Sequence, residues 1–444
     1  MSEKCFFMNF SELSKILSGL SGQNVFVKFN PEILDFTDKT ILNDLLIFSD
    51  KQEFRVSLTD SSLPVILSML KLGVFNKDRK IIVWNWKNFI SYVLAKTGKL
   101  FVPDGAIIDL KIIESYAGLK FKSPKNLVEA LNRIKRIISE GIWKEIKPIY
   151  ETFHLPLITT VIPHLETVGV NDTENNNRVY SYYEIDGQEN GRLKCHKAYK
   201  DSFIPHAMTP EVKKSLKPRM QDDIFMSFDY RGQEVYMLAW LSKDPLLLEL
   251  CEEKDIYVAL YEKILNKQII EKNDRDLAKK MFLPVIYGQS AYSLSQRCNI
   301  QLNFAETIIN RINTLFPLAL AFVEGYQKQV QELGYAKDIF GKRRTFEEGK
   351  EYLVRNFAIQ SPAAVVCLDK LTRLYFALKE KTDLAFSVHD GYVVYATKEN
   401  WKSIYNIAFD ILSSESAFCP GLRLRVTCRA GRNLDDLKLL ARKG

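Results

Sequence analysis

The stretch FSVHDGYVVY, residues 386–395, places an aspartate in the middle of an otherwise apolar strand pair. His389, Asp390 and Gly391 interrupt the apolar run, and Val393 and Val394 resume it. The pattern predicts a β-hairpin with Asp390 at its tip. A carboxylate in such a place costs stability, because charged groups are expensive to remove from water. Asp390 is therefore a candidate metal ligand or catalytic group, and either role calls for a partner.

A second aspartate at a strand end lies in FMSFDYRGQEVYML, residues 225–238. Asp229 closes the apolar strand, and a helical pattern that includes Glu234 follows it. Two such carboxylates can converge on Mg²⁺, which prefers oxygen ligands and substrate phosphates. A pair of these ions can hold the attacking and leaving oxygens of a phosphoryl transfer. The alternative is that Asp229 and Asp390 only cap a helix and a turn.

A third stretch, NDRDLAKKMFLPVIYGQS, covers residues 273–290. Arg275, Lys279 and Leu283 are spaced four residues apart, so they project from one side of a helix. The two cations suit a triphosphate, because Arg can bind two oxygens at once and Lys supplies a point charge. Tyr287 and Gly288 close the segment. A solvated basic helix face is the alternative interpretation.

Taken in order, the three stretches resemble motifs A, B and C of family A DNA polymerases, the DNA polymerase I family. The similarity continues in RVYSYYEIDGQENGRL (178–193), GYAKDIFGKRRTF, RNFAIQSPAA and RAGRNLDDL, and it covers residues 178–436 almost continuously. Departures include Asn190 for a threonine, Leu283 for an aromatic residue, and Gly391 for a glutamate. The resemblance implies an α+β fold, a right-hand polymerase palm and fingers at 151–444.

The same resemblance implies the chemistry. Asp229 and Asp390 would bind two Mg²⁺ ions and catalyse the addition of dNTPs to a primer 3′ end. Glu234 would exclude a ribose 2′-hydroxyl, and Tyr287 would lie beside the nascent base pair. The residues implied to bind the incoming nucleotide are Arg275, Lys279, Tyr287, Glu234 and Leu283.

Primer–template DNA is the expected partner of a further set of side chains. By the resemblance, Arg192 would contact the primer side of the duplex and His389 the primer terminus. Arg343 and Arg344 belong to a basic group that either lines a DNA path or consists of solvated loop charges. The other members of this group are Lys213, Lys214, Lys217, Arg219 and Lys342.

Residues 1–150 show α/β patterning and resemble the RNase H-like 3′–5′ exonuclease domain that precedes the polymerase in this family. Its chemistry needs carboxylates around two metals. KFNPE (28–32) has Asn30 in place of an aspartate, although Glu32 remains, and NWKNF (85–89) has Phe89 in place of another. Asp109 matches a structural position. We expect a degenerate domain without proofreading.

The thumb subdomain is expected to be missing. LPLITTVIPHLETVGV (155–170) resembles the helix that leads into it, and only the polar segment NDTENNN separates this helix from Arg178. Phosphate contacts supply most DNA affinity, so synthesis should be weakly processive unless another protein supplies the grip. The N-terminal domain is the expected docking surface for such a replication or processivity protein.

Composition agrees with a globular protein that binds a polyanion. The 444 residues are 46% hydrophobic and carry a formal net charge of +8. The seven cysteines form no C-x-x-C pair, which predicts buried thiols in a reducing compartment. The chain has no run of about 18 apolar residues and no signal-peptide pattern. We expect a protein without membrane contact in the cytoplasm, that of a host if the source is a phage or mobile element.

Two rival functions stay open. A polymerase that uses ribonucleotides or RNA templates is one, and Glu234 argues against ribonucleotides. The other is a non-catalytic scaffold in a replication complex, suggested by the missing thumb and the altered third stretch. The presence of both Asp229 and Asp390 argues against a scaffold.

Overall fold

The structure is a computed structural model that describes residues 23–30, 43–49, 53–58, 63–119, 122–185, 187–198, 200–268 and 272–440. The chain forms two compact units. Unit 1 comprises residues 1–227, 371–407 and 429–444, and unit 2 comprises residues 228–370 and 408–428. Their boundary runs through two strands and two helices, namely β12 (Ile224–Tyr230), α16 (Val354–Leu378), α17 (Trp401–Ser413) and β17 (Val426–Gly431).

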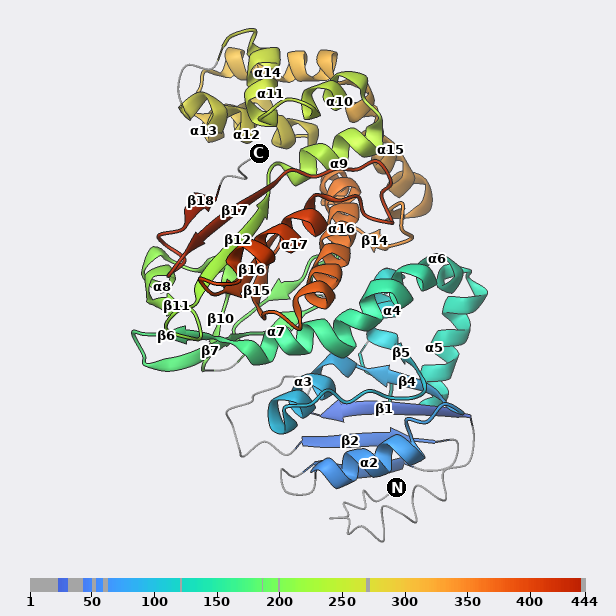
Figure 1. Ribbon diagram of the computed structural model, residues 1–444. Coiled ribbons are helices and arrows are strands. Elements are labelled where there is room, and N and C mark those ends of the chain that lie inside the picture. Colours follow the sequence, from blue (N-terminus) through green and yellow to red (C-terminus); the bar gives the residue numbers. More distant parts are fainter. Residues whose placement is uncertain are drawn as a thin grey trace. The chain divides into compact units, whose positions relative to one another are not determined.

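The N-terminal part of unit 1 is built on a five-stranded sheet in the order β3-β2-β1-β4-β5 (Figure 1). Strands β1, β2 and β3 pair antiparallel, whereas β4 and β5 continue the sheet parallel to β1. The α/β patterning expected of this region is confirmed, whereas its RNase H-like identity stays a prediction. Its strands are Asn24–Asn30, Asn43–Phe48, Glu53–Leu58, Lys80–Trp84 and Ala106–Asp109, with helices α2 (Leu63–Gly73) and α3 (Trp86–Thr97). Sequence patterning missed β3, because EFRVSL lacks a clean alternation of buried and exposed residues.

An unbroken helical stretch leads from this domain toward the palm. It runs through α6 (Ile142–Ile149), two π-type segments (Tyr150–His154 and Leu157–Val161) and α7 (Ile162–Val168). A proline precedes each π-type segment, and each proline removes a helix hydrogen bond. Such interruptions of the hydrogen-bond ladder are where π-bulges occur. The expected division of the chain at residue 150 falls inside this stretch and stays a prediction. Helices α4 (Leu110–Tyr116) and α5 (Leu127–Ser139) precede it.

The segment after α7 forms a β-hairpin of β6 (Val170–Asp172) and β7 (Asn177–Ser181). The polar run 171–177 therefore belongs mostly to this hairpin. All residues from Val168 to Asn177 are described, and this hairpin follows α7 directly. The lack of a thumb stays a prediction. Strands β10 (Ser202–Phe203) and β11 (Leu216–Lys217) complete the small sheet, in the order β10-β7-β6-β11.

The palm sheet has the order β15-β16-β12-β17-β18. The predicted hairpin at 384–396 is confirmed: β15 (Leu384–Val388) and β16 (Gly391–Ala396) pair antiparallel, with Val388 opposite Gly391. Beneath it lies a core of buried side chains from both sheets, including Val170, Phe203, Phe225, Phe386 and Tyr395. Strand β18 (Lys438–Leu440) was not predicted.

Unit 2 is mainly helical, with α10 to α14 gathered in one body (Figure 1). One aspartate organises two of its helices. Asp244 is fully buried and caps α10 through the Leu247 N–H, while its second oxygen accepts from the Leu318 and Ala319 N–H groups at the start of α15. The helices are α9 (Gln233–Ser242), α10 (Pro245–Cys251), α11 (Ile256–Leu265), α12 (Lys272–Ile286), α13 (Ala291–Cys298), α14 (Leu302–Leu315) and α15 (Pro317–Leu333).

Two whole-chain expectations can be compared with the described residues. In the parts of the chain that the structure describes, no helix is long and apolar enough to cross a membrane. Six of the seven cysteines are described, all are free thiols, and all except Cys298 are buried. The prediction of buried thiols is confirmed for those five.

Candidate active site

Asp229 is the penultimate residue of β12 and is exposed, while its neighbours Phe228 and Tyr230 are buried. The strand alternation explains this, because successive side chains point to opposite faces of a sheet. The Asp229 carbonyl accepts a hydrogen bond from Thr427 Oγ1 at 3.1 Å, which ties the strand end to β17. The carboxylate is thus carried by a strand whose flanking residues are anchored in the core.

Asp390 occupies the two-residue turn between β15 and β16. His389, the other turn residue, has a φ of 47°, the left-handed conformation that two-residue hairpin turns require. Its ring packs against that of His206, with centroids 5.0 Å apart and planes at 31°. Nothing in the sequence indicated this contact. Asp390 belongs to unit 1 and Asp229 to unit 2, so their convergence stays a prediction.

Glu234 and Tyr287, both assigned to the nucleotide site by resemblance, lie together in unit 2. The Tyr287 hydroxyl donates a hydrogen bond to Glu234 Oε2. Gln360, on α16, donates to Glu234 Oε1 at 3.3 Å. Sequence reasoning missed Gln360, although a glutamine inside the apolar run NFAIQSPAAVV is a signal of a polar contact.

Arg275, Lys279 and Leu283 lie on α12, as the spacing predicted. The Arg275 Nε donates to Asp255 Oδ2 at 2.8 Å, and the guanidinium lies over the Tyr257 ring at 5.4 Å. Asp255 also caps α11 through the Tyr257 N–H. This pair fixes the orientation of Arg275, while Lys279 is exposed and Leu283 is half-buried.

The expected DNA-contacting residues are distributed over both units. In unit 1, Arg192 is half-buried, and its N–H donates to Asn190 Oδ1 at 3.2 Å. In unit 2, Arg343 lies over the Tyr335 ring at 5.2 Å, and Arg344 lies over Phe346 at 4.7 Å.

Lys342 does not fit the interpretation as a DNA-path or solvated loop charge. Only 2% of it is exposed, and its N–H donates to Asp338, a fully buried carboxylate. Burial raises the pKa of Asp338, and Lys342 opposes that shift. The two residues fix the hairpin of β13 (Tyr335–Lys337) and β14 (Arg343–Thr345).

The positions that the resemblance compares with exonuclease metal ligands can be followed in part on the N-terminal sheet. Phe89 is fully buried among aromatic rings, with its centroid 4.9 Å from that of Trp86 and 5.6 Å from that of Phe101. Asp109 accepts from the Trp86 and Lys111 N–H groups and caps α4, the structural role expected of it. Asn30 ends β1, and Glu32 lies outside the described residues. Within the described ranges, no group of three or more His, Cys, Asp or Glu side chains could hold a metal ion.

Comparison with known proteins identifies the class. The family model for DNA polymerase family A matches residues 120–436. DNA polymerase I of Chloroflexus aurantiacus is 27% identical over 49% of this chain and 24% of its own length. The thermostable DNA polymerase I of Thermus aquaticus is 27% identical over 68% of this chain and 36% of its own length. The chain thus spans only about a quarter to a third of these relatives.

The fold gives the same result. The POL domain of Pol1 from M. smegmatis, solved in complex with DNA primer-template and dNTP, superposes with a TM-score of 0.73. The match covers 96% of this chain and 99% of that one at 14% identity, so it speaks for the fold alone. This fold match is consistent with the palm and fingers expected from the sequence. The chain belongs to DNA polymerase family A.

Proposed function

We propose that this protein is a DNA polymerase that adds dNTPs to a primer 3′ end under the direction of a template. The observation that carries the proposal is the contact of Glu234 with Tyr287. The resemblance assigns both residues to one nucleotide site. They are 53 residues apart in the sequence, and their side chains are in contact in the structure. The family membership and the relatives named DNA polymerase I support the same activity.

Asp229 and Asp390 are the proposed metal ligands, and Mg²⁺ is the proposed metal. The donors fit a hard cation, since both are carboxylates and neither is fully buried. Their convergence on the metal is part of the proposal and rests on the resemblance of their two stretches to motifs A and C. Two ions bound there would activate the primer hydroxyl and neutralise charge on the leaving pyrophosphate.

The nucleotide would be held by side chains of unit 2. Lys279 is exposed on α12 and supplies a mobile charge for the phosphates. Arg275, oriented by Asp255, offers a guanidinium that can bind two phosphate oxygens. Glu234, fixed between Tyr287 and Gln360, would stand where a ribose 2′-hydroxyl would otherwise fit, so deoxynucleotides would be favoured. Leu283 would take the place of the family's aromatic residue beside the nucleotide.

DNA would be held weakly and without proofreading. Arg192, His389, Arg343 and Arg344 are the proposed contacts to primer and template. Phe89 fills the place of a metal ligand with a buried ring, so the exonuclease-like domain would be inert. Low processivity follows from the missing thumb, and a protein partner docked on the N-terminal domain would compensate. Longer products on addition of host extract, with trap DNA present, would support the partner.

The test is extension of a labelled primer on a DNA template with Mg²⁺ and dNTPs. Wild-type extension that Asp229→Ala and Asp390→Ala each reduce by at least about 10³-fold would support the proposal, since each removes a metal-binding group. Asp222→Ala, an exposed aspartate near the start of the same strand, is the matched control and should extend normally. No extension at high enzyme and low salt, even in host extract, would favour the scaffold.

A further inference from the structure

A pocket of about 760 Å³ lies inside unit 1, at the carboxyl ends of the parallel strands of the exonuclease-like sheet. Lys28 of β1, Trp84 at the end of β4 and Asp109 at the end of β5 line it. The chain leaves β1 toward β2 on one side and leaves β4 toward β5 on the other. Ligand sites of α/β sheets form at such a switch point, outside the carboxyl ends of the strands.

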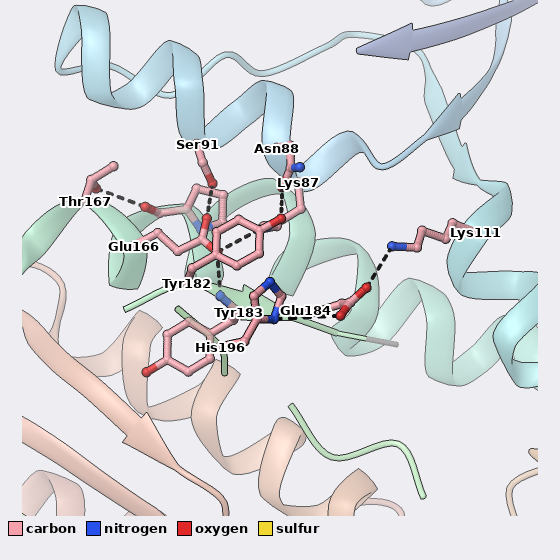
Figure 2. Close-up of polar contacts among 11 residues, drawn as sticks. Lys87, Asn88, Ser91, Lys111, Glu166, Thr167, Tyr182, Tyr183, Glu184 and His196 are labelled. Carbon is pink, nitrogen blue, oxygen red and sulfur yellow. Dashed lines mark hydrogen bonds and ion pairs between the residues drawn. The ribbon is translucent and has the colours of Figure 1, made fainter. Parts of the chain in front are cut away.

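The lining of this pocket is cationic. Among the described residues that line it, the charged side chains and the histidine are Lys28, Lys87, Lys111, Lys122, His196, Asp109 and Glu184. Within this described lining, four lysines thus accompany two carboxylates, in a place where the resembled domain needs carboxylates for metals. Figure 2 shows Lys111, Glu184 and His196 close together beside the Tyr182 ring.

The carboxylates near the lysines are largely committed to other groups. Asp109 accepts from two backbone N–H groups, at 2.9 and 3.1 Å. Glu166, behind the pocket wall, pairs with Lys87 at 2.7 Å. Glu184 is shared between Lys111 at 3.4 Å and His196 at 4.0 Å, both long for an ion pair. An added anion could approach the Lys111 ammonium more closely than Glu184 does at 3.4 Å.

The aromatic walls offer no open face to a base. The Lys87 ammonium covers the Tyr182 ring, 3.9 Å from its centroid, and His196 meets the ring edge-on at 5.0 Å. Trp84 and Tyr182 are each 5% exposed. A ligand would therefore be recognised through its charged oxygens and not through stacking.

We propose that this pocket binds phosphate groups without a metal ion, either those of a free nucleotide or the terminal phosphate of a nucleic-acid strand. Ammonium groups on several walls suit a compact anion with several oxygens. The proposal does not depend on polymerase activity. In this proposal, lysines bind the anion at the place where the resembled domain would bind metal ions.

The probes are inorganic tripolyphosphate, dATP, dCTP, and a short single-stranded oligonucleotide with and without a 5′-phosphate. Binding to the full-length chain is measured by calorimetry in EDTA, so that binding which needs Mg²⁺ is suppressed. We expect tripolyphosphate, dATP and dCTP to bind within about threefold of one another, because no base contact is offered. Lys122→Glu, at an exposed lining residue, should weaken binding about tenfold or more, which corresponds to about 1.4 kcal/mol, because a cation that attracts the anion is replaced by a carboxylate that repels it.

Matched variants separate the pocket from general charge. Lys135→Glu changes an exposed lysine of α5 outside the pocket and should leave binding unchanged, and Lys122→Arg should retain it. Lys28→Gln is a second lining variant, used if its thermal unfolding matches wild type. Binding only of the phosphorylated oligonucleotide would assign the strand end, and binding of tripolyphosphate would assign the free anion. No metal-free binding, or equal losses in Lys122→Glu and Lys135→Glu, would overturn the proposal.

Discussion

Glu166→Gln is the perturbation that tests most directly how the exonuclease-like domain is joined to the palm. Glu166 lies on α7 and is fully buried (Figure 2). Its carboxylate accepts from Lys87 Nζ at 2.7 Å and Ser91 Oγ at 2.6 Å, both on α3, and from the Tyr183 N–H at 2.9 Å. The amide that replaces it keeps one acceptor oxygen but leaves the Lys87 ammonium, 6% exposed, without its counter-charge.

The expected cost is about 3–5 kcal/mol, the usual penalty for breaking a buried ion pair from one side. Lys87→Met in the same background removes the stranded charge, so the double variant should recover most of the loss. Glu151→Gln is the control on the preceding helical turns. Its carboxylate is 56% exposed and 3.8 Å from Lys147, and an exposed pair of this kind contributes about 0–1 kcal/mol.

Urea unfolding followed by tryptophan fluorescence reports the change, since Trp84 and Trp86 are buried beside Lys87 in the chain. Unfolding free energies are compared for four proteins. These are wild type, Glu166→Gln, Glu151→Gln and the double variant Lys87→Met/Glu166→Gln. A Glu166→Gln variant within 1 kcal/mol of Glu151→Gln would refute the reasoning, because it would show that Lys87 finds water or another anion.

The other predictions concern pH and nucleotide choice. Burial raises the pKa of Glu114 from an ordinary 4.5 to about 7, against the opposing charge of Arg133 3.4 Å away. The folded state therefore holds a proton that the unfolded state releases, so this group's stabilisation is complete below pH 4.5 and is lost as pH rises through 7. Glu114→Gln should flatten the pH dependence of the unfolding free energy in that window, and an unchanged slope would contradict the assignment. Glu234→Ala should lower the dNTP-to-rNTP ratio of kcat/KM at least about tenfold, because the side chain held by Tyr287 and Gln360 is removed. An unchanged ratio would show that another group selects the sugar.

Sequence reasoning was most successful where local patterning and motif order coincide. The hairpin around Asp390 and the strand that ends near Asp229 were predicted, because alternation and turn residues are local signals. The resemblance assigned Glu234 and Tyr287 to one nucleotide site, but it did not predict the hydrogen bond between them. Helical spacing placed Arg275 on a face of α12 but gave no information about its partner Asp255, 20 residues earlier.

Side-chain partners across the fold explain what could not be predicted. Lys342 begins a run of three basic residues, a pattern typical of the protein surface. It is nevertheless buried, because the chain folds Asp338 back against its backbone. The ring contact of His206 with His389 joins a short 3-10 helix (Pro205–Ala207) to a hairpin turn far along the chain, and no periodicity in either segment indicates it. Such pairings depend on tertiary contacts that a single sequence does not display.

The hydrogen bonds of Glu166 give the N-terminal part of unit 1 a structural role beside any partner or ligand. Glu166 connects α3 of that domain to the Tyr183 N–H. The hydroxyl of the same Tyr183 donates to the Ser387 carbonyl at 3.1 Å and accepts from the Ser387 N–H at 2.9 Å. Ser387 lies on β15, three residues before Asp390. These buried hydrogen bonds thus link α3, through Tyr183, to β15, the strand that leads into the Asp390 turn. Since buried polar networks are costly when only partly satisfied, loss of the domain would disturb that hairpin. We therefore expect the fold to require this part of the chain whether or not it has chemistry of its own.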